Sequence, residues 1–251
     1  MISLEPKPPE LVCDEKLNVV LNRLSLTDTA TLRRLEVVEQ LIQECGLVRE
    51  KPEVYGEDEK YLNPIRRGLW QIPRQLAEFS IFLSTRKINS FLEIGTFSGG
   101  TFTFLMGYLN RFNPGLRGIT IDTCDANPPV HLWKNWFDAQ FIIASSREYV
   151  GQSFDLCLID GWHSFFGVTW DYVNVGRHAK LCAFHDINDD IVEYWPGNDG
   201  GVPRFWRQFR ALHREKHFHE FLYHTRGERV MGIGVIEQDN VGRNDYAQHT
   251  P

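Results

Sequence analysis

The stretch "FLEIGTFSGG", residues 91–100, decides the fold of this chain. Its first four residues form a short, mostly apolar run that is typical of a strand buried in a sheet. A turn with glycines at 95, 99 and 100 follows, and "GTFTFLMGYLN" then shows the composition of a helix. Glycines let a backbone turn tightly and approach a ligand closely, so this segment predicts a cradle for a nucleotide-like cofactor.

Strand-like and helix-like segments alternate along the rest of the chain. The predicted strands are "SFLEIG", "GITID", "AQFIIAS", "FDLCLID", "KLCAFHD", "HEFLYHT" and "VMGIGVIE". Such alternation indicates an α/β fold with helices on both faces of a parallel sheet. We therefore expect a Rossmann-like, doubly wound, mainly parallel seven-stranded sheet with an antiparallel C-terminal strand and an N-terminal helical extension.

The N-terminal part has a different pattern. Proline-rich residues 1–25 predict an extended lead-in, and residues 28–45 predict a helix that is capped by Thr27 or Asp28. This helix has an apolar face that either packs on its own domain or meets a second subunit, which leaves a homo-oligomer open. Residues 48–64 are charged and interrupted by proline, which predicts a loop.

Three domains are expected from these patterns. They are an N-terminal helical and loop extension over 1–69, a cofactor-binding domain over 70–237, and a flexible tail over 238–251.

Composition excludes several classes of function. The net charge is −6 and Lys and Arg form no cluster, which disfavours tight binding of nucleic acid. No apolar run approaches the roughly 18–20 residues that span a membrane. The opening "MISLEPKPPE" lacks the apolar core of a signal peptide, so we expect a cytoplasmic protein. The five cysteines are odd in number and form no CxxC pair, which indicates reduced thiols.

Acidic residues at strand ends narrow the choice of cofactor. Glu93 precedes the glycine turn, where a carboxylate would repel a pyrophosphate and attract a cationic amino group. The G-x-G-x-x-G spacing of dinucleotide-binding proteins is absent, which disfavours a nicotinamide-dependent oxidoreductase. Asp122 ends the next strand, where its carboxylate can accept hydrogen bonds from both hydroxyls of a ribose.

The order Glu93-x-Gly95-x-x-x-Gly99-Gly100, Asp122 and a strand ending in Asp160 resembles the class I S-adenosylmethionine-dependent methyltransferases. The resemblance covers residues 70–237. It implies S-adenosylmethionine as the cofactor, with its methionine part on the glycine loop, its ribose on Asp122 and its adenine near the serines after the third strand. The implied cofactor-binding residues are Glu93, Gly95, Thr96, Gly99, Gly100, Asp122, Ser145, Ser146 and Asp160.

A second group of polar residues follows the fourth and fifth predicted strands. Asp160 and His163 follow one strand, and His185, Asp186 and Asn188 follow the next. Carboxylate and amide oxygens suit Mg²⁺, whereas histidine favours softer metals such as Mn²⁺ or Zn²⁺. Two close carboxylates repel each other unless a cation or a proton lies between them.

The Asp-Gly-x-His and His-Asp pairs are similar to the cephalosporin-hydroxylase-like and macrocin-type O-methyltransferases, several of which bind a divalent metal. This similarity implies Asp160, Asp186 and Asn188 as ligands of Mg²⁺ or Mn²⁺. The chain departs from the subgroup at Trp162, where a second acid or histidine is usual, and at "GRHAK", which replaces "KPGG".

The expected reaction is methyl transfer to a hydroxyl of a small molecule or saccharide, with Asp160 in a catalytic role and His163 or His185 as the base. A binding or scaffold protein without catalysis is the alternative. Residues 194–206 either form a lid or pack as a loop, and Trp70 and Gln71 are further candidates for contact with the cofactor.

Overall fold

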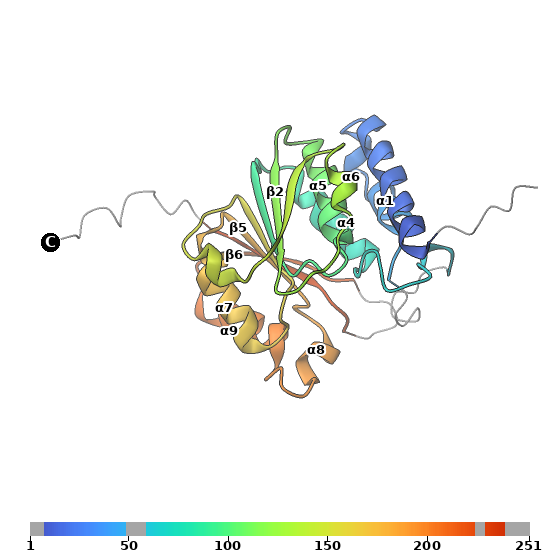
Figure 1. Ribbon diagram of the computed structural model, residues 1–251. Helices are drawn as coiled ribbons and strands as arrows, with labels where there is room; N and C mark the ends of the chain where they lie inside the picture. The colour runs from blue at the N-terminus through green and yellow to red at the C-terminus, as the bar shows by residue number, and fades with distance from the viewer. Residues whose placement is uncertain (1–7, 49–58, 224–228, 239–251) are drawn as a thin grey trace, which may run out of the picture.

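The computed structural model describes residues 8–48, 59–223 and 229–238, and it consists of one twisted sheet between two layers of helices (Figure 1). The sheet order is β3-β2-β1-β4-β5-β7-β6. The strands are β1 (Ser90–Ile94), β2 (Arg117–Asp122), β3 (Asp138–Ile143), β4 (Leu156–Ile159), β5 (Leu181–His185), β6 (His217–Phe221) and β7 (Ile233–Glu237).

Strand directions confirm the predicted topology. Strands β1 to β5 pair in parallel, and β7 runs antiparallel to both β5 and β6. The chain builds the sheet outward from β1 through β2 to β3 and then crosses to β4 on the other side of β1. This reversal of strand order is the place where doubly wound sheets bind their ligands, beyond the carboxyl ends of the strands.

Helices cover both faces of the sheet. One side carries α1 (Pro9–Leu26), α2 (Leu35–Glu44), α4 (Pro73–Leu83), α5 (Gly100–Asn110) and α6 (Val130–Trp133). The other carries α7 (Phe165–Asn174) and α9 (Gly201–Leu212), with the short α8 (Asp190–Tyr194) beyond the end of the sheet. Along β1, Phe91 packs into the hydrophobic core shared with α4 and α5 on one face of the sheet. Leu92 and Ile94 pack into the core shared with α7 and α9 on the other face. Burial on both faces explains why the strand sequences are continuously apolar.

The expected extended lead-in is wrong, because residues 9–26 form α1. Leu17, Leu21 and Leu24 recur at helical spacing and are buried in the core that contains α5. Gly107 of α5 allows this close approach, since a Cβ there would lie 2.4 Å from the Leu21 side chain. Burial of this apolar stripe outweighs the prolines, which stand at the helix start, where their missing N–H groups cost nothing.

The single predicted helix over residues 28–45 is also wrong in its first half. Asp28 accepts the backbone N–H of Thr31 (2.9 Å), which starts the 3₁₀ turn Thr31–Arg33 before α2 begins at Leu35. Helix α2 packs on α4 of the same chain. Residues 49–58 of the predicted loop and 239–251 of the predicted tail lie outside the described residues.

Across the three described segments, every helix is too short or too polar to cross a bilayer.

Candidate functional site

The glycine turn is pressed against the end of β4. Gly95 has φ +97°, and a Cβ at this position would lie 2.0 Å from the carbonyl oxygen of Asp160. Gly99, with φ +73°, is the residue that precedes α5, and a Cβ on Gly100 would lie 2.5 Å from the carbonyl oxygen of Gly68. The backbone therefore requires glycine at these positions, and the turn lies directly beside the residue that begins the polar cluster.

Asp122, at the end of β2, holds this turn in place. Its Oδ2 accepts the backbone N–H groups of Thr96 (3.0 Å) and Phe97 (3.2 Å). Its Oδ1 accepts longer contacts from the N–H (3.4 Å) and the thiol (3.5 Å) of Cys124. One carboxylate oxygen thus organises the loop, and the other is the better placed to accept a ribose hydroxyl. The sequence did not reveal the first of these roles, because it depends on the pairing of β1 with β2.

Glu93 is buried beneath the turn. Its Oε2 accepts a hydrogen bond from the Thr120 hydroxyl (2.6 Å), which is also 2.7 Å from the Thr96 hydroxyl. Burial raises the pKa of Glu93 well above its ordinary value, and the charges of Asp160 and Asp122 act in the same direction. A cationic amino group bound nearby would favour the ionised carboxylate, as the resemblance implies for the cofactor.

The serines after β3 have structural partners. Ser145 caps the 3₁₀ helix Ser146–Tyr149 in a capping box with Glu148. Ser146 is buried and its hydroxyl accepts the Asn174 side-chain amide (2.9 Å). Burial raises the pKa of the neighbouring Asp171 to about 6, against the effect of its hydrogen bond with Ser146. The adenine contact of both serines stays a prediction.

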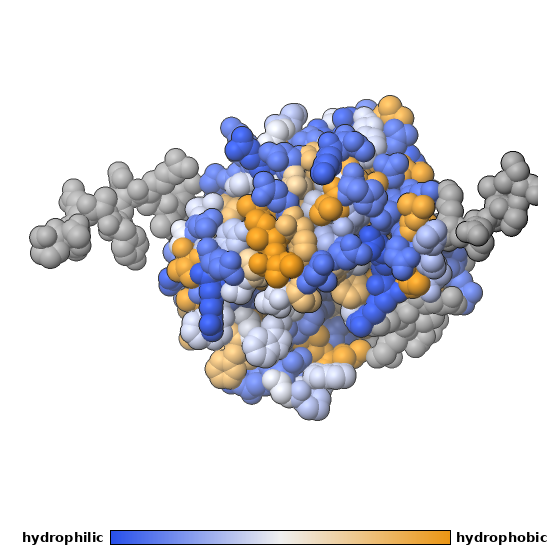
Figure 2. Space-filling model, viewed as in Figure 1, coloured by the Kyte–Doolittle hydropathy of each residue, from blue (hydrophilic) through white to orange (hydrophobic). Residues whose placement is uncertain are grey.

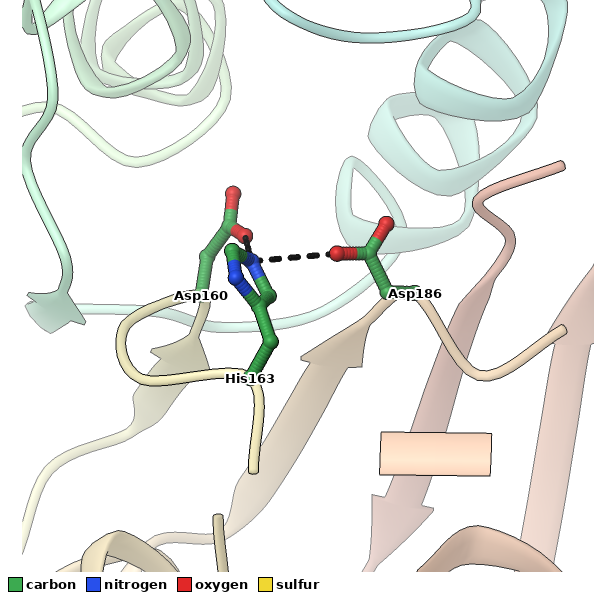
Figure 3. A group of neighbouring side chains, drawn as sticks. All are labelled: Asp160, His163 and Asp186. Atoms are coloured by element: carbon green, nitrogen blue, oxygen red, sulfur yellow. Dashed lines mark ion pairs between the residues drawn. The ribbon is translucent and has the colours of Figure 1, made fainter. Parts of the chain in front are cut away.

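Three polar side chains converge beyond β4 and β5 (Figure 3). The Nε2 atom of His163 lies 3.6 Å from Oδ1 of Asp160 and 3.1 Å from Oδ2 of Asp186. One ligand atom from each of the three residues lies within 4.8 Å of the others. The structure therefore brings together two of the three predicted metal ligands and adds His163 to them.

His185, the last residue of β5, is the fourth member of the cluster. Its Nδ1 lies 3.1 Å from both Asp160 and Asp186, while its Nε2 is buried without a hydrogen-bond partner in the described part of the chain. The side-chain amide of Gln71 donates to Asp160 (3.4 Å), so this predicted cofactor residue reaches the cluster. The Oε1 atom of Gln71 is likewise buried and has no hydrogen-bond partner among the residues that the structure describes.

Charge in this cluster is balanced between acids and histidines. Burial opposes the charged form of His163, but its hydrogen bonds to Asp160 and Asp186 outweigh burial and raise the pKa of His163 to about 10. Burial also opposes the charged form of His185, but the charges of Asp160 and Asp186 outweigh burial and raise the pKa of His185 well above its ordinary value. Although burial again opposes it, His185 holds the pKa of Asp186 well below its usual range.

The residues after Asp186 mainly fix the backbone. Asp186 itself has φ +61°, an uncommon conformation for a residue other than glycine, and such strain often occurs at functional sites. The N–H of Asn188 donates to the carbonyl of Met231 (2.9 Å), and its role as a metal ligand stays a prediction. Asp189 is buried, and its two oxygens accept the N–H groups of Val192 and Met231, so it caps α8.

Exposed aromatic side chains lie on the segments that follow β4 and β5. Trp162, between Asp160 and His163, is 73% exposed, and Tyr194, at the end of α8, is 72% exposed. The N–H of Phe165 donates to the carbonyl of Asn198 (2.8 Å), which ties the loop after β4 to the segment after α8. Pale to orange side chains gather over this lower region of the molecule, where α7, α8 and α9 lie (Figure 2).

Solved structures share this fold at low sequence identity. The O-methyltransferase from Bacillus cereus in complex with SAH has a TM-score of 0.50 and 13% identity, over 94% of each chain. Cofactor-bound Rv0187 from MTB has a TM-score of 0.51 and 14% identity, over 68% of this chain and 83% of that chain. This chain has the class I methyltransferase fold. No family model matches it, and no curated protein is similar enough in sequence to match.

Proposed function

We propose that this protein is an S-adenosylmethionine-dependent O-methyltransferase that acts on a small molecule or saccharide with the help of a divalent cation. The observation that supports it best is the contact of Gly95 with Asp160, which puts the cofactor loop and the carboxylate cluster at one point of the sheet. The motifs that resemble the cephalosporin-hydroxylase-like and macrocin-type enzymes favour that subgroup.

The cofactor fits the glycine turn and its acids. Gly95 and Gly99 allow the positive φ of the turn and its close packing on Asp160 and Pro128, Oδ1 of Asp122 would accept a ribose hydroxyl, and Glu93 would supply negative charge for the amino group. S-adenosylmethionine would supply an electrophilic methyl group on a sulfonium. The protein's task is then to hold an acceptor oxygen in line with that methyl group and to take its proton.

The donor set also fits a divalent cation. Asp160 and Asp186 offer carboxylate oxygens from neighbouring strand ends, and His163 offers Nε2. This mixture of oxygen and nitrogen donors suits Mn²⁺ better than Mg²⁺. A cation held here would lower the pKa of a bound hydroxyl by Lewis-acid action.

His163 is the better placed of the two candidate bases. Its side chain is 43% exposed, compared with 5% for His185, so only His163 is open to an acceptor. A cation held by Asp160 and Asp186 alone would remove the negative field that raises the pKa of His163 and would leave its Nε2 free to accept a proton, whereas a cation that also binds Nε2 would exclude His163 as the base.

The exposed aromatic residues suit the acceptor. Trp162 and Tyr194 are both exposed, and they lie on the segments after β4 and β5, which the hydrogen bond between Phe165 and Asn198 ties together. Ring faces pack well on the apolar face of a sugar or on an aromatic ring. We expect Trp162→Ala to raise the KM for the acceptor while leaving affinity for S-adenosylhomocysteine unchanged.

Calorimetric titration with S-adenosylhomocysteine tests the cofactor assignment. We expect binding to the wild type and its loss in Asp122→Ala, while Asp125→Asn, which changes an exposed acid three residues away, binds normally. Binding of equal affinity in both variants, or none to the wild type, would refute the assignment and favour the scaffold alternative.

Titration with MnCl₂ tests the metal assignment separately. Asp160→Ala should lose Mn²⁺ binding and methyl transfer but keep most of its affinity for S-adenosylhomocysteine. Turnover of an acceptor by Asp160→Ala at the wild-type rate would exclude the metal-centred mechanism.

A further inference from the structure

An open polar cavity lies at the opposite edge of the sheet, away from the glycine turn. It has a volume of about 410 Å³ and is formed where α4 and α5 end and β1 begins. The residues that shape it include Arg33, Arg86, Lys87, Asn113, Phe112 and Pro114. No Asp or Glu is among its lining residues, although the whole chain carries a net charge of −6.

Part of this positive charge has a structural purpose. The C-terminal carbonyls of a helix attract cations, and Arg33 donates to the carbonyl of Ser84 (3.3 Å) at the end of α4. Arg86 donates to the carbonyl of Phe82 (2.9 Å) and forms an ion pair with Glu237 (3.1 Å). Helix capping therefore accounts for some of these contacts, but not for every donor in the cavity.

Three donors remain without an acceptor. Nε of Arg86 and Nδ2 of Asn113 are both buried and lack a hydrogen-bond partner among the described residues. Asn113 is held in place because its Oδ1 accepts the N–H of Ile88 (2.9 Å), so the amide cannot turn away. Lys87 is exposed at the cavity, and its side chain has no ion pair within the described part of the chain. Buried donors without acceptors are rare, and a bound water, ion or ligand is one explanation for each of them.

We propose that this cavity binds the phosphate group of a small phosphorylated compound. A phosphate supplies several strong acceptors and two negative charges, which match Arg33, Lys87 and the unpartnered donors. The cavity is larger than one phosphate needs, and Phe112 and Pro114 provide an apolar wall for the rest of the molecule. This inference does not depend on the proposed methyltransferase activity.

Phenyl phosphate is a suitable probe because it combines the charge with an apolar ring. We expect saturable binding of phenyl phosphate, weaker binding of inorganic phosphate, and no binding of phenol. A saturating amount of S-adenosylhomocysteine should not displace phenyl phosphate, since the two sites lie at opposite edges of the sheet. Displacement by S-adenosylhomocysteine would place the phosphate in the cofactor site and would overturn the proposal.

Two variants test the location. Lys87→Gln changes an exposed side chain and should weaken phenyl phosphate by about tenfold, the effect of losing one charge-assisted contact. The matched control Lys134→Gln removes an exposed lysine elsewhere and should leave affinity unchanged. Equal weakening by the two variants would show nonspecific attraction to positive charge.

The NMR signal of the Asn113 side-chain amide reports directly on binding in this cavity. Its ¹⁵N-edited NMR signal, identified by its absence in Asn113→Ser, should shift when phenyl phosphate binds. An unchanged signal at saturation would contradict the site. Substitution of Arg33 or Arg86 could unfold the protein, because both side chains also hold the end of α4. The NMR measurement avoids this problem because phenyl phosphate is added to the wild-type protein.

Discussion

Replacement of Gly95 by alanine tests the link between the cofactor loop and the carboxylate cluster. The new Cβ would lie 2.0 Å from the carbonyl oxygen of Asp160, whereas real Cβ contacts are at least 3.0 Å. The turn or the end of β4 must therefore move by about 1 Å. A positive φ costs alanine about 1 kcal/mol, and overpacking adds about 1–3 kcal/mol. We expect the free energy of unfolding to fall by about 2–4 kcal/mol in Gly95→Ala.

Gly115→Ala is the matched control. Gly115 has φ +86°, close to the +97° of Gly95, but no atom lies within 4 Å of its Cβ position. Its free energy of unfolding should fall only by about 1 kcal/mol, the cost of a positive φ for alanine. The variant should bind S-adenosylhomocysteine and Mn²⁺ normally. Urea unfolding followed by tryptophan fluorescence measures stability, and calorimetry measures both ligands. Equal destabilisation of the two variants, with Mn²⁺ binding intact in Gly95→Ala, would show that the contact does not couple the loop to the cluster.

Three further predictions concern other parts of the molecule. Arg67 makes a buried two-point ion pair with Asp14 of α1 (2.9 and 3.1 Å). Arg67→Met should lower the free energy of unfolding by about 3–5 kcal/mol, because it leaves the buried carboxylate of Asp14 without its counter-charge. The double variant with Asp14→Leu should recover most of that loss in urea unfolding, and no recovery would contradict the explanation. Burial raises the pKa of Asp171 from 3.8 to about 6, so its contribution to stability is full below about pH 4 and is lost as the pH rises through 6. Between pH 4 and pH 6, the free energy of unfolding should therefore fall by about 1–3 kcal/mol less in Asp171→Asn than in the wild type. Parallel profiles of unfolding free energy against pH would refute this. Cys124 is the one exposed thiol of the five, and the Asp122 carboxylate raises its pKa. A thiol reagent should modify one cysteine in the folded protein, and faster in Asp122→Ala; rapid modification of a second thiol would conflict with the structure.

The succession of strands along the chain, and the polar residues that follow them, were predictable from sequence. Continuous apolar runs and the glycine turn at 95–100 are local patterns, and each strand they predict is present. The N-terminal region was not predictable in the same way. Helix α1 has a weakly amphipathic sequence that becomes helical by packing on α5, and the prolines before it suggested an extended chain.

The sequence by itself determined which chemical groups stand at the strand ends, because a parallel sheet places all its carboxyl ends on one edge. Only the tertiary structure decided how those groups pair. Packing of the strands and loops sets Asp122 to hold the glycine turn and brings His163 onto Asp160 and Asp186. At the far edge it leaves donors of Arg86 and Asn113 without acceptors among the described residues. Such pairings join residues that are distant along the chain, and their distances are fixed only when the whole core is packed.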